Sequence, residues 1–283
     1  MRDLAFGFSP CPNDTFAFWA AVHGRVSEGG IRLVPVLRDI EELNARAVED
    51  RDPLPVTKLS IPALARVADR YAVLPAGAAL GYGCGPLIVV RAGDRAGSPA
   101  DLRGRRLAIP GRHTTAFLLF EILCGVPCDV APMRFDRIVP AVAAGEADAG
   151  LLIHESRFTH ERRGLRALAD LGRLWERATD GPLPLAVIAV RADVPRKDQR
   201  ALARTIRRSV ETALADPALA REYVRANARE MDEGVCEKHI RLYVNEFSVD
   251  LGSRGRSAVE EMLRRAGDLA SLRGAPPSFV ERN

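Results

Sequence analysis

Two apolar runs without interspersed polar residues constrain the fold of this chain most. Residues 87–90 (LIVV) and 185–190 (LAVIAV) are uninterrupted apolar segments of strand length. Strands of this kind are buried on both faces, as in a sheet that helices cover on both sides. Because the segment between the two runs has strand and helix patterns of its own, the runs indicate a block of chain inserted into another lobe.

The remaining pattern indicates an α/β protein of two lobes. Strand-like segments lie at residues 5–8, 31–37, 54–59, 107–109 and 149–153. Helical patterns alternate with them, which is typical of βαβ units with mixed or mostly parallel sheets flanked by helices. We therefore expect residues 1–92 and 185–283 to form the first lobe and residues 93–184 to form the inserted one. Such a chain plan predicts a two-strand hinge and a ligand cleft between the lobes.

Composition narrows the class of ligand. Lys and Arg (41) nearly balance Asp and Glu (37), which gives a net charge of +4 and a pI near 9.0. Because these charges are spread along the chain, we expect no nucleic-acid partner. The mild positive excess favours a small anionic ligand.

The N-terminal sequence, the lengths of the apolar segments and the cysteine content favour a cytoplasmic location. The opening MRDLAFGFS has neither a basic segment followed by a long apolar run nor a cleavage site, and no later segment reaches about 18 apolar residues. We therefore expect a cytoplasmic protein that does not insert into a membrane, with its five cysteines reduced. Cys124 and Cys128 have no second pair of ligands at zinc-site spacing, so no metal is expected. The sequence is compatible with a homodimer.

Three candidate binding segments follow predicted strands, where ligands of open α/β sheets bind. In SPCPNDTF (9–16), two prolines stiffen the chain before a helix that Asn13 or Asp14 can cap. Free backbone N–H groups at that helix start, with the Ser9 hydroxyl nearby, can also hold a carboxylate or a sugar hydroxyl. The pattern fits both a rigid capped turn and a binding loop.

The second segment is Lys58, Leu59 and Ser60, at the end of an apolar strand. A lysine there would carry its charge toward the cleft and suits a substrate carboxylate. The alternative is a solvated lysine followed by a serine that caps a helix.

The third segment and one histidine lie in the inserted block. Thr114 and Thr115, in GRHTT, offer hydroxyls and backbone donors before an apolar helix, although Thr114 can equally be only its N-cap. His154, in GLLIHESRF, stands where a buried strand ends. A neutral imidazole accepts protons near neutral pH, so His154 is a candidate general base, against the alternative of a structural histidine.

Six segments of the chain carry a family resemblance when they are taken together. The segments are SPCPNDTFAFWAAVHGRV, TKLS, GCGPLIVVR, IPGRHTTAFLL, GLLIHESRFT and YVNEFSVDLG, in order from about residue 5 to residue 252. They resemble the 1,4-dihydroxy-6-naphthoate synthases of the futalosine route to menaquinone. The resemblance implies the fold of type 2 periplasmic binding proteins in an enzyme that works inside the cell.

What the resemblance implies for function is a carbon–carbon lyase without metal or organic cofactor. Such an enzyme converts cyclic dehypoxanthinyl futalosine, a carboxylate with a sugar-derived ring, into 1,4-dihydroxy-6-naphthoate. His154 matches the proton acceptor of the family, and residues 58–60 and 114–115 fall on its substrate-binding segments. His160 departs from the tyrosine expected after GLLIHESRFT, and the role of Asn245 in YVNEFS is left open.

Three other readings remain. A non-catalytic solute-binding protein for small anions would share the fold but would need an export signal. Chorismate dehydratase, another enzyme of the same pathway and fold, should lack the GLLIHESRF pattern. The effector domain of a transcription regulator would need a DNA-binding segment ahead of the first strand.

Overall fold

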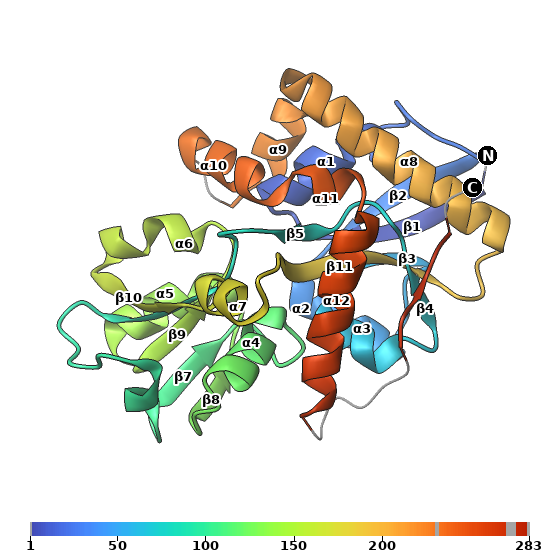
Figure 1. The fold of residues 1–283 in the computed structure, drawn as a ribbon. Coiled ribbons are helices and arrows are strands. Elements are labelled where there is room, and N and C mark those ends of the chain that lie inside the picture. Colours follow the sequence, from blue (N-terminus) through green and yellow to red (C-terminus); the bar gives the residue numbers. More distant parts are fainter. Residues whose placement is uncertain (1, 230–231, 270–275, 282–283) are drawn as a thin grey trace. The chain divides into compact units, whose positions relative to one another are not determined.

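The computed structural model describes residues 2–229, 232–269 and 276–281. The chain divides into two compact units, which Figure 1 shows in ribbon form. The first unit comprises Met1–Gly81 and Pro184–Asn283, and the second comprises Tyr82–Leu183. Each unit has its own sheet with helices packed on it, so each is described by itself.

A mixed seven-stranded sheet forms the centre of the first unit. Its strands are β1 (Arg2–Phe8), β2 (Ile31–Leu37), β3 (Val56–Ser60), β4 (Tyr71–Val73), β5 (Ala79–Gly81), β11 (Leu183–Arg191) and β12 (Ser278–Phe279). They run in the order β12-β4-β11-β3-β1-β2, and β5 pairs with β11. β1 is parallel to β2 and β3, whereas β11 is antiparallel to β3 and β4. This parallel β1–β3 pair brings the carboxyl ends of two strands together.

The position of β2 at the edge of this sheet explains a proline within it. Pro35 lies inside the strand IRLVPVL, and proline cannot donate a hydrogen bond to a second neighbouring strand. β2 pairs only with β1 among the described strands, so the missing N–H is tolerated.

Helices cover the first sheet and complete its core. They are α1 (Pro12–Val22), α2 (Ile40–Val48), α3 (Ile61–Val67), α8 (Arg196–Ala215), α9 (Arg221–Asn227), α10 (Glu233–Tyr243), α11 (Glu246–Val249) and α12 (Gly252–Gly267), with a 3-10 turn at Pro217–Ala220. α1 packs against α8, α9 and α10. Phe6 and Phe8 of β1 are buried against Phe18 of α1, with ring centroids 4.9–5.2 Å apart. This aromatic cluster fixes α1 on the sheet.

A five-stranded sheet forms the second unit, in the order β10-β6-β9-β7-β8. The strands are β6 (Leu87–Arg91), β7 (Arg106–Ile109), β8 (Asp129–Pro132), β9 (Ala149–Leu152) and β10 (Leu165–Asp170). The helices are α4 (Thr115–Leu123), α5 (Phe135–Ala144), α6 (Ser156–Thr159) and α7 (Leu171–Thr179), with 3-10 turns at Pro99–Leu102 and His160–Arg163. β7 is parallel to β8 and β9, whereas β6 is antiparallel to β9 and β10.

Gly150 allows α5 to lie directly on β9. A Cβ atom at this position would come within 2.5 Å of Ile138 and 3.0 Å of Val142, both on α5. Any larger residue would push the helix away from the strand that ends before His154. The glycine therefore helps to set the place of that histidine.

The sequence anticipated most of these strands, but β6 lies in a different unit from the one expected. The predicted first lobe included residues 87–90, yet β6 pairs with β9 and β10 and so belongs to the second unit. The reason is that a doubly buried strand looks the same in either sheet, and only its hydrogen-bond partners assign it. At the other junction, Pro184 begins the returning segment of the first unit, close to the predicted residue 185.

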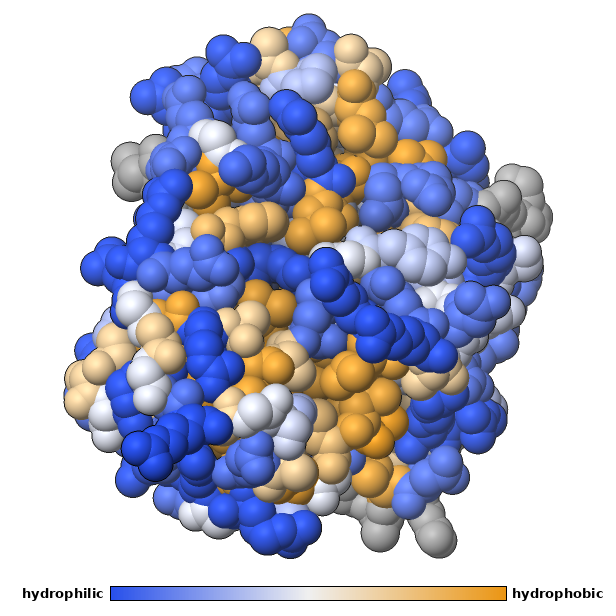
Figure 2. Space-filling model, turned by 60° about the vertical axis from the view of Figure 1, so that its left-hand side comes forward, coloured by the Kyte–Doolittle hydropathy of each residue, from blue (hydrophilic) through white to orange (hydrophobic). Residues whose placement is uncertain are grey.

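The surface is mainly hydrophilic on the face that Figure 2 draws, with hydrophobic side chains in patches between charged ones. Among the described residues, no helix combines the length and apolar character needed to cross a membrane.

Candidate active site

A buried carboxylate organises the polar residues of the first unit. Asp14 lies in the first turn of α1, where Pro12 supplies a helix start without losing a hydrogen bond. Its Oδ2 accepts from the backbone N–H of Ser9 at 3.1 Å and from the Ser9 hydroxyl at 2.8 Å. Its Oδ1 accepts from the Asn13 amide at 2.8 Å and from the Lys58 ammonium. Four donors on two oxygens suit a carboxylate anion, which only accepts.

Lys58 is buried rather than solvated. Only 5% of the residue is exposed, and its ammonium forms an ion pair with Asp14. The parallel pairing of β1 and β3 matches Gly7 with Thr57, so Lys58 lies beside the end of β1, next to the loop that carries Ser9. The structure thus contradicts the reading of Lys58 as an ordinary surface lysine. A buried charge of this kind needs its partner, because an unpaired one is costly.

Ser60 has a buried partner that the sequence analysis missed. The Ser60 backbone N–H donates to Asn44 Oδ1 at 2.9 Å, and Asn44 Nδ2 donates to the Ser60 hydroxyl at 3.1 Å. Ser60 is the N-cap residue of α3, but its side chain makes no capping bond. Leu59, between Lys58 and Ser60, is fully buried in an apolar cluster with Tyr71 and Ala63, so its side chain is part of the core.

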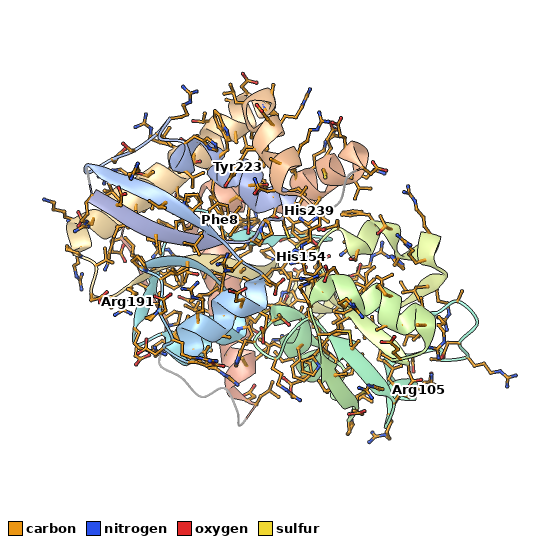
Figure 3. The ribbon with its side chains drawn as sticks, turned by 180° about the vertical axis from the view of Figure 1, so that it is seen from behind. Phe8, Arg105, His154, Arg191, Tyr223 and His239 are labelled. Atoms are coloured by element: carbon orange, nitrogen blue, oxygen red, sulfur yellow. The ribbon has the colours of Figure 1, made fainter. Side chains whose placement is uncertain are left out.

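His239 is a second buried residue that the sequence analysis missed. It lies on α10, as Figure 3 shows. It is 1% exposed, and its Nε2 is 2.9 Å from Asn13 Oδ1. The sequence does contain a signal for an inward-facing side chain here, because Cys236 and Tyr243 precede and follow it at helical spacing and are also buried. No local signal, however, connects α10 with the first turn of α1, more than 200 residues earlier.

The threonine pair of the second unit lies at the start of α4. Thr114 is the N-cap: its hydroxyl accepts from the Phe117 N–H at 3.4 Å and donates to the Gly111 carbonyl at 2.7 Å. Thr115 is the first residue of the helix and is 3% exposed. The structure confirms the capping role of Thr114, which does not exclude a ligand at the same helix start.

His154 lies two residues after the end of β9 and has an unusual backbone. Its φ is +57°, in the left-handed region that bulky residues rarely adopt. Its ring meets the ring of Phe135 edge-on, with centroids 4.7 Å apart and planes at 66°, and Phe135 is itself buried at the start of α5. Strained backbone at a histidine that is only half-buried is typical of functional positions, because the fold must maintain it against a cost of about 1–3 kcal/mol.

Two residues whose roles the sequence left open have structural contacts. His160 is 6% exposed, and its Nδ1 lies 3.0 Å from the Arg157 carbonyl. Asn245 caps α11, accepting from Phe247 N–H at 2.9 Å, and its amide donates to the Leu80 carbonyl at 2.9 Å. Asn245 therefore stabilises a helix end and ties it to β5.

Two cysteines of the second unit are unreactive thiols. Burial raises the pKa of the Cys84 thiol to about 12 and that of Cys124 to about 11, so both stay protonated near neutral pH. Because the thiolate is the nucleophilic form of cysteine, neither side chain is a candidate nucleophile.

The fold defines the class of protein. The chain is similar to the ligand-binding component of an ABC-type import system from Staphylococcus aureus, with 14% identity, a TM-score of 0.73 and coverage of 100% of this chain and 97% of that one. A protein from Archaeoglobus fulgidus is 32% identical, with a TM-score of 0.87 over 95% of this chain and 98% of its own. The architecture is that of the two-lobed periplasmic binding proteins.

Sequence comparison then gives the family. The family model described as "Menaquinone biosynthesis" matches residues 4–268. A 1,4-dihydroxy-6-naphthoate synthase from Thermus thermophilus is 50% identical over 99% of this chain and 100% of its own. Another from Streptomyces coelicolor is 45% identical over 93% of this chain and 92% of its own. The chain belongs to the menaquinone biosynthesis family.

Proposed function

We propose that this protein is a carbon–carbon lyase that converts cyclic dehypoxanthinyl futalosine into 1,4-dihydroxy-6-naphthoate. Two relatives at 50% and 45% identity, matched over nearly their whole length, are named 1,4-dihydroxy-6-naphthoate synthase. The structural observation that carries the proposal is His154, an imidazole just beyond the end of β9, on a strained backbone and packed nearly perpendicular to the ring of Phe135.

His154 acts as the proton acceptor. Near neutral pH a histidine is largely the free base, so it can remove a proton from the carbocycle of the substrate. The electron pair of that C–H bond then drives cleavage of a carbon–carbon bond, and the ribose-derived remainder leaves. Formation of the aromatic naphthoate ring makes the step favourable. The packing against Phe135 limits rotation of the ring, which favours a fixed direction of proton transfer.

The polar residues bind the substrate, which is an anion with a carboxylate and a sugar-derived ring. In the first unit these are Ser9, Asn13, Asp14, Lys58, Ser60 and the backbone of Leu59. Of the three ammonium hydrogens of Lys58, the described residues engage one, through Asp14, so donors remain for a substrate carboxylate. In the second unit Thr114 and Thr115 supply hydroxyls and the N-terminal N–H groups of α4.

Asp14 serves this role as an anchor for Lys58 and not as a second base. Its two oxygens already accept from Ser9, Asn13 and Lys58, so a proton would displace an existing donor. The proposal places the enzyme in the cytoplasm, as expected for a biosynthetic step on a soluble nucleoside derivative. A homodimer is compatible with it.

The test is to incubate the purified protein with cyclic dehypoxanthinyl futalosine and to follow the naphthoate by its absorbance. We expect turnover by the wild type and a loss of about 10²–10⁴-fold in kcat for His154→Ala. Equal turnover by both proteins would remove His154 from the mechanism. Substrate binding without turnover by the wild type would favour a solute-binding protein, and turnover of chorismate would favour the dehydratase.

A further inference from the structure

We infer that His239 is a positioning residue of the active site: through Asn13 it fixes the Asp14–Lys58 pair that faces the substrate. The inference rests on the proposed function for what the pair binds, but the hydrogen-bonded chain exists without substrate. The chain joins three elements of the first unit, namely α10, the start of α1, and β3.

Every link of the chain is buried and has hydrogen-bond geometry. His239 Nε2 lies 2.9 Å from Asn13 Oδ1, and Asn13 Nδ2 donates to Asp14 Oδ1 at 2.8 Å. Asp14 Oδ1 in turn accepts from the Lys58 ammonium. All four residues are at most 6% exposed. In such surroundings a lost partner leaves a polar group unsatisfied, so the links depend on one another.

The chemistry of the groups fixes the direction of each hydrogen bond. The Asp14 carboxylate only accepts, so Asn13 must present its NH2 group to it. The Asn13 carbonyl oxygen therefore faces His239, and an oxygen there requires a donor. It follows that His239 carries a hydrogen on Nε2. A histidine with a hydrogen on Nδ1 alone would place a lone pair against the Asn13 oxygen and favour a flipped amide, which would present oxygen to Asp14.

The position of His239 is itself well determined. Its ring packs on Tyr243 one turn later, with centroids 4.6 Å apart and planes at 41°. α10 begins at a true N-cap, since the Asp232 carboxylate accepts from the Val235 N–H at 3.1 Å, and the helix packs against α1. The sheet therefore supplies Lys58 and α10 supplies the donor that orients its counter-ion.

Substitution of His239 separates positioning from catalysis. Glutamine can place an amide N–H2 near the position of Nε2, whereas leucine fills similar space without any donor. We expect His239→Leu to raise KM about tenfold, as loss of one buried hydrogen bond would, with kcat within about twofold of the wild type. His239→Gln should recover most of the KM. If leucine leaves KM unchanged, or if glutamine and leucine raise it equally, the inference is wrong.

Ile240→Ala is the matched control. Ile240 is the next residue on the same helix and packs against the core of the first unit, but it has no polar side-chain atom. We expect this variant to lower the melting temperature without raising KM. A tenfold rise in KM for Ile240→Ala would show that α10 acts through packing alone and would overturn the role of the hydrogen bond.

A measurement without substrate keeps the inference testable if the proposed function fails. In protein labelled with ¹⁵N-histidine, long-range ¹H–¹⁵N correlation spectra report which ring nitrogen carries hydrogen, and the His239→Gln spectrum assigns the signal. We expect hydrogen on Nε2 of His239. Hydrogen on Nδ1 alone would overturn the inference even if the enzyme is active. Absence of turnover in the wild type would instead refute the proposed function and leave this result standing.

Discussion

The candidate groups of the first unit are held by one another, whereas the candidate base of the second unit is held by backbone and ring packing. Asp14, Lys58, Asn13 and His239 form one buried hydrogen-bonded chain. His154 has a left-handed backbone, and its ring packs nearly perpendicular to the ring of Phe135. The difference suits two tasks. A binding group must keep its charge where solvent is excluded, and a general base must keep the orientation of its ring while its protonation state changes.

The largest effect should come from removing the counter-ion in the first unit. Asp14→Leu leaves Lys58 buried without its partner, and we expect the free energy of unfolding to fall by about 3–5 kcal/mol in urea denaturation. Asp14→Leu combined with Lys58→Met should recover much of this loss, because no charge is then left unpaired. The double variant should still bind substrate poorly. If it is no more stable than Asp14→Leu alone, the ion pair is not what the single variant disrupts.

The corresponding change in the second unit should affect rate instead of charge balance. Phe135→Leu removes the aromatic ring that packs against His154, so we expect kcat to fall about tenfold, equivalent to about 1.4 kcal/mol, with KM nearly unchanged. Phe120→Leu is the control, since Phe120 is equally buried in the second unit on α4. It should lose stability and keep kcat. A rise in KM without a fall in kcat for Phe135→Leu would mean that the ring contacts substrate and does not orient the base.

The same contrast explains what the sequence could predict. Residues 31–37 are a strand as expected, and the predicted site residues lie at or just after the ends of β1, β3, β7 and β9, because apolar runs mark strands and strand ends mark sites. His239 and Asn44 escaped prediction since their partners are defined by tertiary contacts. The left-handed φ of His154 was not predicted, because glycine is the usual sequence signal for such a backbone and this position is a histidine.

A smaller effect should separate the two roles of Thr114. Thr114→Val removes the hydroxyl that caps α4, and we expect a loss of about 1 kcal/mol in stability and a severalfold rise in KM, while Thr114→Ser should keep both near wild type. Asn245→Ala is the matched cap in the first unit. It should lose similar stability with KM unchanged, because the bonds of the Asn245 side chain hold the start of α11 and tie it to β5. If Thr114→Val also leaves KM unchanged, Thr114 is a cap and nothing more.

Both units should lose stability at alkaline pH. This effect is the smallest of the predicted effects when stability is measured at neutral pH. Burial raises the pKa of Cys84 in the second unit from 9.0 to about 12, and the pKa of Tyr71 in the first unit from 10.0 to about 12. Each group stays neutral in the folded state while its unfolded counterpart ionises. Its contribution to stability is therefore complete below the unfolded pKa and is lost as the pH rises toward about 12.

We expect the free energy of unfolding to fall between about pH 9 and pH 12, with Cys84 contributing a slope of up to about 1.4 kcal/mol per pH unit. Cys84→Ala should flatten the curve from about pH 9, and Tyr71→Phe only from about pH 10, because the unfolded phenol ionises later. Tyr71→Phe should also lower stability at every pH, since the Tyr71 hydroxyl donates to the Leu54 carbonyl at 2.9 Å. Urea denaturation at a series of pH values measures both slopes. If the wild-type slope persists in both variants, the alkaline loss arises from other groups, and the burial of these two carries no pH dependence.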